Sequence, residues 1–283
     1  MKKTYIIGEI GINHNGSLEK AKRLIDIAAA AGCDAVKFQK RNPDVCVPEA
    51  QKSKPRSTPW GEMTYLEYKW KLEFGQEEYD EIDRYCKQQG IAWSASPWDM
   101  ESLKFLEQYD IPFIKIASAT LTDDEILEAA IATGKRVIIS TGMSTEEEID
   151  HAIKVLQEAA KKYNNTNKIG VLHCNSTYPA PVDELNLSAI KTLTEKYPNV
   201  EVGYSGHEFR LGTSVAAVYL GASIVERHIT LDRTDYGSDQ MSSVEPQGLF
   251  KLVSGIRELE AAYGDGIISV TDSELEPRRR LRG

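Results

Sequence analysis

The chain alternates eight times between a short β-rich run and an amphipathic stretch with helical spacing. Strict alternation of this kind indicates parallel strands joined by crossover helices. Eight such units over roughly 250 residues match the size of a (β/α)8 TIM barrel. Strands are expected at 5–11, 35–39, 91–97, 113–118, 136–141, 169–174, 200–205 and 223–228, and helices near 17–31, 76–89, 99–108, 123–133, 145–162, 188–196, 212–220 and 246–263.

A doubly wound open sheet is the main rival fold. It usually has fewer units and carries a G-x-G-x-x-G turn after its first strand, and no such turn follows residues 5–11. We therefore predict an α/β protein with a TIM-barrel domain over residues 1–264. The irregular segment 40–74 is long for a connection, which indicates a possible lid. Residues 265–283 are expected to be a C-terminal extension or a linker stub.

Composition narrows the possible functions. The chain has 283 residues and a net charge of −9, which argues against a general nucleic-acid partner. No apolar run approaches the roughly 18 residues of a membrane helix, and the N-terminus lacks a signal peptide's long apolar region. The four cysteines show no C-x-x-C spacing and are expected to be free thiols. We therefore expect a cytoplasmic protein with no nucleic-acid or membrane partner.

Charged residues fall on three of the expected strands. Barrel interiors are normally filled by Val, Ile and Leu, yet Glu9, Lys37 and Lys115 occupy strand positions here. An unpaired charge inside would cost several kcal/mol, so such a set indicates compensating partners. Two lysines among strand-end hydroxyl groups predict a bound anion, either phosphate or carboxylate.

Two of the five histidines, His207 and His228, end consecutive strands. Because the carboxyl ends of barrel strands meet at one mouth, this placement favours a divalent metal site about as much as two hydrogen-bonded core histidines. Other polar residues near the strand ends include Gln39, Ser96, Ser118, Ser140, Ser176, Tyr178, Ser205, Glu226 and Asp239.

A set of segments, taken in order, resembles the sialic acid synthase family. They are IIGEIGINHNG, AVKFQK, FIKIAS, ISTGM, LHCNSTYPAP, GYSGHE and VERHITLDRTDYGSDQMSSVEP, and they extend from about Tyr5 to Gly264. The resemblance implies a transferase that condenses phosphoenolpyruvate with an open-chain N-acylmannosamine-type sugar, with or without a 6-phosphate. The products would be a sialic (nonulosonic) acid and phosphate, formed by C–O cleavage. It also implies a homodimer.

The resemblance further implies a role for each matching residue. His207 and His228 would bind Mn²⁺ or Mg²⁺. Glu9, Lys37, Lys115 and His228 would be catalytic, with Glu9 managing protons. Phosphoenolpyruvate would contact Lys37, Ser96, Lys115, Ser118, Ser176 and Ser205, and the sugar would contact Glu9, Gln39, Tyr178 and Asp239.

Two departures from the family pattern stand out. Thr120 occupies a position where many relatives carry an acidic residue. Most relatives also continue into a small antifreeze-like domain that supplies an arginine to the partner's sugar site. This chain ends at Gly283, where that domain would start. Either the sequence is a truncated piece of a longer protein, or it is a short form that closes its site differently.

Three alternatives remain open. A 3-deoxy-octulosonate or 3-deoxy-heptulosonate phosphate synthase would use the same phosphoenolpyruvate chemistry with another aldose phosphate. An aldolase would form a Schiff base on Lys115 or Lys37. A non-catalytic barrel would bind a sugar or an anion without turnover.

Overall fold

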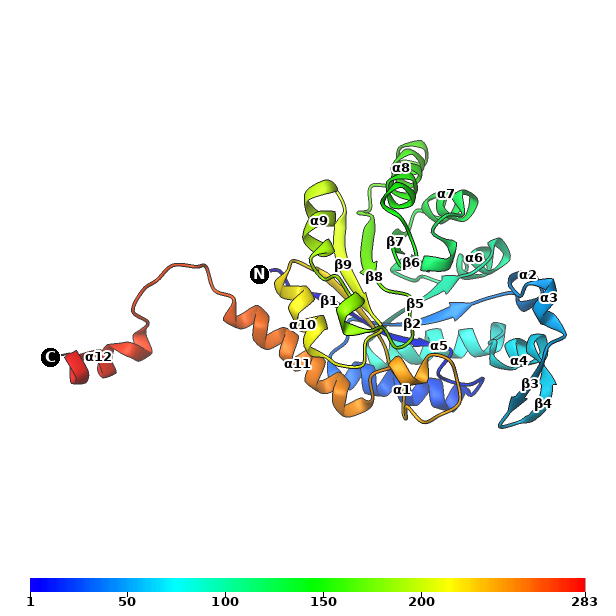
Figure 1. The fold of residues 1–283 in the computed structure, drawn as a ribbon, viewed down its shortest axis with the longest axis horizontal. Coiled ribbons are helices and arrows are strands. Elements are labelled where there is room, and N and C mark those ends of the chain that lie inside the picture. Colours follow the sequence, from blue (N-terminus) through cyan, green and yellow to red (C-terminus); the bar gives the residue numbers. More distant parts are fainter. Residues whose placement is uncertain (283) are drawn as a thin grey trace.

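A computed structural model describes residues 1–282, and eight parallel strands surround its central axis (Figure 1). They follow the order β5-β2-β1-β10-β9-β8-β7-β6. The hydroxyl group of Ser94 on β5 donates to the carbonyl group of Phe113 on β6, which joins the two ends of the sheet. The strands are β1 (Tyr5–Gly11), β2 (Ala35–Lys40), β5 (Ala92–Pro97), β6 (Phe113–Ile116), β7 (Arg136–Ser140), β8 (Gly170–Cys174), β9 (Glu201–Gly206) and β10 (Ile224–His228).

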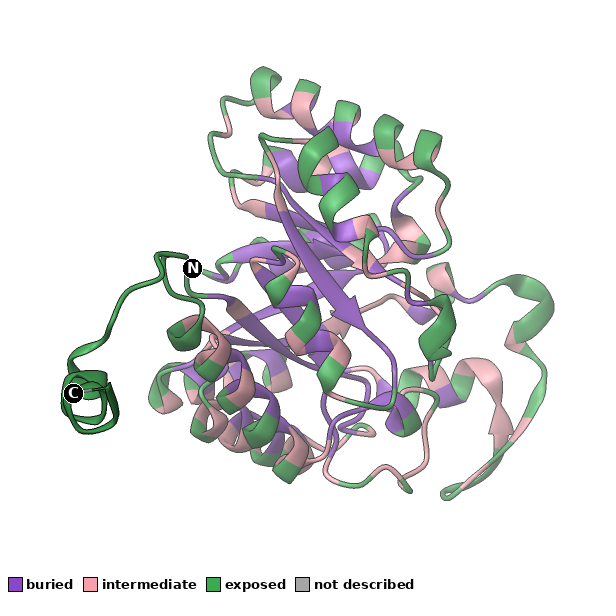
Figure 2. Cartoon of the chain, turned by 60° about the vertical axis from the view of Figure 1, so that its left-hand side comes forward, coloured by how far each residue is buried: buried purple, intermediate pink, exposed green. Residues whose placement is uncertain are grey.

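Eight helices cover the outside of the barrel, and their exposed faces contrast with the buried strands in Figure 2. Several begin at the caps that the sequence offers: Ser17 accepts a hydrogen bond from the Lys20 amide, and Thr145 forms a capping box with Glu148. The TIM-barrel prediction is confirmed. The helices are α1 (Leu18–Ala31), α5 (Gln76–Gln89), α6 (Met100–Leu106), α7 (Asp124–Ala132), α8 (Glu146–Lys162), α9 (Ala189–Lys196), α10 (Gly212–Tyr219) and α11 (Pro246–Ala262).

The interior of the barrel is divided into an apolar floor and a polar layer above it. The floor is a separate cluster of buried side chains: Ile7, Ala35, Phe113, Ile138, Leu172 and Ile224. Side chains in a strand alternate between its two faces, so the next inward position on each strand lies two residues further on. Those positions hold Glu9, Lys37, Lys115, Ser140, Cys174 and Glu226. The strand period therefore places the charges directly above the floor.

The segment 40–74 contains more regular structure than the sequence indicated. It forms α2 (Pro43–Cys46), α3 (Glu49–Lys52), a hairpin of β3 (Pro55–Thr58) and β4 (Gly61–Thr64), and α4 (Tyr65–Leu72). These elements are too short to produce a periodic pattern. The Arg56 Nε atom donates to the Tyr236 hydroxyl group at 2.7 Å, so the hairpin contacts the loop after β10.

The chain beyond α11 leaves the barrel and ends in α12 (Leu275–Arg282), which lies well apart from the other helices in Figure 1. No helix among residues 1–282 combines the length and the apolar character required to cross a membrane.

Candidate active site

Four charged side chains meet inside the barrel above the apolar floor. The Lys37 ammonium group lies 2.8 Å from Glu9 Oε2 and 3.9 Å from Glu226 Oε2. The Lys115 ammonium group lies 3.9 Å from Glu226 Oε1. All four residues are at most 4% exposed, so their charges compensate one another without bulk water. We call these four residues the reaction cluster.

Serine hydroxyl groups accept further hydrogen bonds from the two lysines. Lys37 donates to Ser96 Oγ at 2.8 Å, and Lys115 donates to Ser140 Oγ at 2.5 Å. Ser205 Oγ donates to Glu226 Oε1 at 3.0 Å. The ammonium groups are thereby held by groups that an incoming anion can replace or join.

The pKa values of the two carboxyl groups of the reaction cluster are shifted in opposite directions. Burial raises the pKa of Glu9 above its usual value, against the lowering effect of Lys37. Burial acts the same way on Glu226, but Lys115 and Lys37 together lower the pKa of that carboxyl group to about 2. Burial also lowers the pKa of Lys115. A carboxyl group with a raised pKa beside a permanently ionised one is typical of acid–base sites.

A cavity of about 170 Å³ lies directly above this cluster. Its walls include all but one of the twelve site residues expected from the sequence. The exception is Asp239, which instead lies beside His228. The walls also contain Glu226, Ser140 and Trp98, which were not assigned a role from the sequence. The alternation that placed His228 inside the barrel also places Glu226 there.

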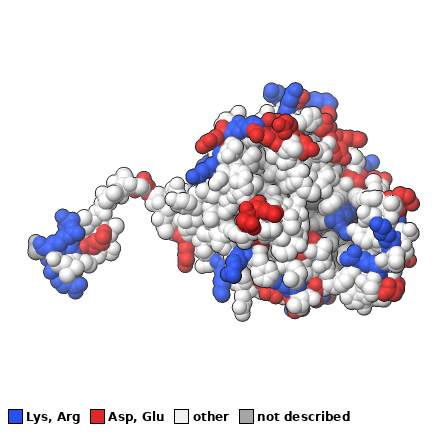
Figure 3. Space-filling model, in the orientation of Figure 1, with Lys and Arg blue, Asp and Glu red and all other residues white. Residues whose placement is uncertain are grey.

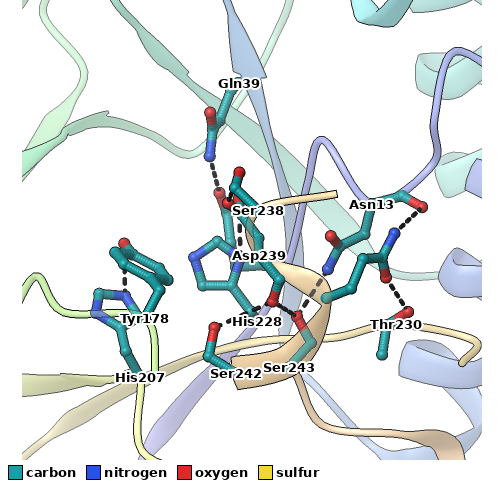
Figure 4. Close-up of polar contacts among 12 residues, drawn as sticks. Asn13, Gln39, Tyr178, His207, His228, Thr230, Ser238, Asp239, Ser242 and Ser243 are labelled. Atoms are coloured by element: carbon teal, nitrogen blue, oxygen red, sulfur yellow. Dashed lines mark hydrogen bonds and ion pairs between the residues drawn. The ribbon is translucent and has the colours of Figure 1, made fainter. Parts of the chain in front are cut away.

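The two histidines lie side by side at the cavity wall, with ring centroids 5.3 Å apart (Figure 4). His207 Nδ1 lies 2.6 Å from the Asn175 carbonyl oxygen, so Nδ1 donates and Nε2 keeps its lone pair. The Tyr178 hydroxyl group lies 3.0 Å from that Nε2 atom. Burial lowers the pKa of His207 to about 3, which favours the neutral imidazole that binds metals.

His228 also presents a nitrogen without a partner. Its Nδ1 atom is buried, makes no hydrogen bond and lies 3.8 Å from Asp239 Oδ2. Within residues 1–282 no group of three or more His, Cys, Asp and Glu side chains is placed to hold a metal ion. The donor set therefore fits a cation that takes two imidazole nitrogens from the protein and its other ligands from substrate and water.

The remaining predicted residues surround the same space. Gln39 Nε2 donates to Glu9 Oε1 at 3.2 Å, and Ser118 Oγ accepts a hydrogen bond from the Gly142 amide at 3.0 Å. A Cβ atom on Gly142 would lie 2.1 Å from Ser176 Oγ, so only glycine allows this turn to approach the two serines. A wider cavity of about 840 Å³ between α8 and α9 shares Ser176 with the reaction cavity.

A second buried ion pair lies on the outer face of the strands that carry the histidines. Arg227 Nη1 lies 3.0 Å from Glu208 Oε1, and the two side chains are 1% and 0% exposed. Because Arg227 alternates with Glu226 and His228 along β10, it points away from the cavity. We call Glu208 and Arg227 the outer pair.

Comparison with known proteins places the chain among synthases. A model of the NeuB family matches residues 24–268. The chain is 39% identical to N,N'-diacetyllegionaminic acid synthase of Campylobacter jejuni, over 97% of this chain and 81% of that protein. It is 35% identical to human N-acetylneuraminate-9-phosphate synthase, over 98% of this chain and 76% of that protein.

Solved structures agree with this placement. The N-acetylneuraminic acid synthetase of Leptospira borgpetersenii superimposes with a TM-score of 0.85 at 33% identity, covering 99% of this chain and 93% of that one. A truncated 3-deoxy-D-arabino-heptulosonate 7-phosphate synthase of Thermotoga maritima matches with a TM-score of 0.68 at 14% identity, which shows the barrel fold alone. The family model matches most of this chain, and the named synthases align with nearly all of it. The protein therefore belongs to the NeuB family of sialic acid-type synthases.

Proposed function

We propose that the protein condenses phosphoenolpyruvate with the open-chain form of an N-acylmannosamine-type sugar, giving a nonulosonic acid and phosphate. The observation that carries this proposal is the pair of buried ammonium groups, Lys37 and Lys115, at the base of a cavity whose wall holds two imidazoles. Phosphoenolpyruvate carries two anionic groups on a small apolar body. Two fixed cations at the base of a cavity are the complement of such a molecule.

The proposed reaction forms one carbon–carbon bond and breaks one carbon–oxygen bond. C3 of phosphoenolpyruvate bonds to the aldehyde carbon, water adds at C2, and the bond from C2 to the phosphate oxygen breaks. The oxygen of the water becomes the new ketone oxygen, and its two protons end on the new hydroxyl group and on phosphate. Lys37 and Lys115 stabilise the charge that moves onto the leaving phosphate.

Glu9 is the proposed proton carrier of this reaction. Burial raises its pKa, which suits a carboxyl group that exchanges a proton with a substrate hydroxyl or with water. Gln39 donates to Glu9 and keeps its carboxyl group turned toward the cavity. Glu226 stays ionised between the two lysines and holds them in place.

The proposed metal site consists of His207 and His228. A divalent cation there, Mn²⁺ or Mg²⁺, would supply a Lewis acid for the aldehyde oxygen. The hydroxyl group of Tyr178 now lies at hydrogen-bond distance from His207 Nε2 and must move aside when that nitrogen takes a cation. Asp239 Oδ2 lies 3.8 Å from His228 Nδ1 and adds a negative charge beside this imidazole.

A panel of sugars tests the reaction. The full chain is incubated with phosphoenolpyruvate, Mn²⁺ and each of N-acetylmannosamine, N-acetylmannosamine 6-phosphate, arabinose 5-phosphate and erythrose 4-phosphate, and released phosphate is measured. Phosphate release with N-acetylmannosamine or its 6-phosphate, but with neither of the other two sugars, supports the proposal. Release only with arabinose 5-phosphate or erythrose 4-phosphate would assign the chain to the 3-deoxy-sugar acid synthases instead.

Two further measurements separate the mechanism from its rivals. With a heavy-oxygen label in the bridging position of phosphoenolpyruvate, C–O cleavage carries the label into phosphate. Borohydride reduction in the presence of pyruvate should leave Lys115 and Lys37 unmodified, because no Schiff base forms. A trapped adduct on either lysine would show an aldolase.

A further inference from the structure

A third cavity lies within the segment 40–74, beside the reaction cavity. It has a volume of about 250 Å³, and its walls include Arg41, Lys69, Tyr65 and Trp98. Trp98 also lines the reaction cavity, so the two spaces share a wall. Gln39 of the reaction cavity hydrogen-bonds to the guanidinium group of Arg41. The third cavity therefore adjoins the side of the reaction cavity that the sugar is proposed to occupy.

The two cations of this cavity lack anionic partners. Neither Arg41 nor Lys69 forms a salt bridge with a carboxylate within residues 1–282. The Arg41 Nε atom is buried and makes no hydrogen bond, while its guanidinium group stacks 4.2 Å from the centre of the Trp98 ring. Arg41 is thus held rigidly with a donor that nothing in the described chain accepts.

Two nearby carboxylates are already engaged by other groups. Glu73 accepts from Lys40 Nζ at 2.8 Å and from the Arg41 amide at 3.0 Å. Asp99 accepts from the Asn42 amide at 2.7 Å and caps α6. Burial and the like charge of Arg41 lower the pKa of Lys69 to about 8. Two confined cations that repel each other favour the binding of an anion between them.

On the face shown in Figure 3, Lys and Arg side chains gather over the part of the molecule that carries α2, α3 and α4.

We infer that the Arg41–Lys69 cavity binds the phosphate group of a phosphorylated sugar, so that the sugar 6-phosphate is the preferred co-substrate. This inference rests on the proposed function. In the proposed function, Lys37 and Lys115 bind phosphoenolpyruvate, which leaves Arg41 and Lys69 for an anion at the other end of the second substrate. The relatives include both kinds of enzyme by name, since one forms a 9-phosphate and another forms legionaminic acid without one.

The experiment compares kcat/KM for N-acetylmannosamine 6-phosphate with kcat/KM for N-acetylmannosamine. The full chain is measured beside Lys69→Met and Arg41→Met, with Lys71→Met as the matched control, because Lys71 lies on the same helix and is exposed. The ratio should fall by about tenfold to a hundredfold in each cavity variant, as expected for one charged contact. Lys71→Met should leave the ratio unchanged, and Lys69→Arg should restore most of it.

Three results would overturn the inference. The first is a wild-type ratio near one that neither variant alters. The second is an unchanged ratio combined with a raised KM for phosphoenolpyruvate, which would assign the cavity to that substrate. The third is equal calorimetric affinity of wild type and Lys69→Met for N-acetylmannosamine 6-phosphate. This measurement also decides the inference if no sugar is turned over and the proposed function fails on its own. Binding at least about tenfold weaker in Lys69→Met supports the cavity's role.

Discussion

The barrel contains two buried clusters of charge on opposite faces of the same strands, and they are built differently. The outer pair is surrounded by protein partners: Glu208 accepts from the Tyr204 hydroxyl group at 2.9 Å as well as from Arg227, and Arg227 also donates to the Arg210 carbonyl oxygen at 3.1 Å, although its buried Nε atom has no hydrogen-bond partner. The reaction cluster instead lines a cavity, where Glu226 Oε2 is buried without a hydrogen-bond partner. One cluster is closed by protein, and the other opens to a cavity.

This difference separates a structural role from a chemical one. The outer pair includes the residue after His207 and the residue before His228, so it fixes the ends of β9 and β10 behind the imidazoles. A Cβ atom on Gly206 would lie 2.6 Å from Glu208 Oε2, and therefore glycine is needed for the pair to approach the strand. The reaction cluster keeps unused hydrogen-bonding capacity on the side where a substrate arrives.

The largest expected effect comes from breaking the outer pair. Glu208→Gln should reduce the free energy of unfolding by about 3–5 kcal/mol, because Arg227 then remains buried without a counter-charge. Chemical denaturation measures the change. The double variant Glu208→Gln with Arg227→Met should recover part of the loss. A decrease below about 1 kcal/mol would remove the distinction between the two clusters.

The reaction cluster should respond in activity rather than in stability. Lys115→Met should lower kcat/KM for phosphate release by about a hundredfold to a thousandfold, the usual effect of removing one group that stabilises developing charge. The stability loss should be smaller than for Glu208→Gln, because Lys37 and Ser205 still contact Glu226. Lys154→Met on the exposed face of α8 is the control. Unchanged kinetics would exclude Lys115 from the reaction.

The smallest effect is expected at Tyr178, which lies beside the proposed metal site. Tyr178→Phe removes the hydroxyl group that lies at His207 Nε2 and should therefore tighten Mn²⁺ binding by up to about tenfold. Electron paramagnetic resonance titration without substrates measures this affinity directly. Tyr163→Phe, at an exposed tyrosine, is the matched control. Weaker Mn²⁺ binding in Tyr178→Phe would mean that the hydroxyl group supports the cation rather than competing with it.

The sequence predicted the barrel because its helices and strands are long enough to show their periods. All eight expected strands overlap observed ones, although the fourth is shorter because Ser118–Thr120 form a 3-10 helix. The same reasoning failed within 40–74, where α2 and α3 have only four residues each. One turn of helix produces no recognisable apolar repeat, so the lid's structure depends on caps and tertiary contacts.

Strand alternation predicted which residues share the candidate site. It could not predict contacts that depend on which side chains meet in the folded chain. Alternation brought Glu9, Lys37 and Lys115 to one layer, and it would also have identified Glu226. The outer pair could not be predicted, because it depends on which side chains meet between β10 and α10. The metal, the homodimer and the cytoplasmic location stay predictions.

The hydrogen bonds between the hairpin and the loop after β10 bear on how a substrate enters the site. Arg56 donates to the Tyr236 hydroxyl group, and that hydroxyl group donates to the Ser57 carbonyl oxygen at 3.1 Å. Tyr236 belongs to the segment that also carries Asp239. If the sugar enters beneath the hairpin, we expect it to break these hydrogen bonds and to displace the segment that carries Asp239, so that entry of the second substrate is coupled to the alignment of His228.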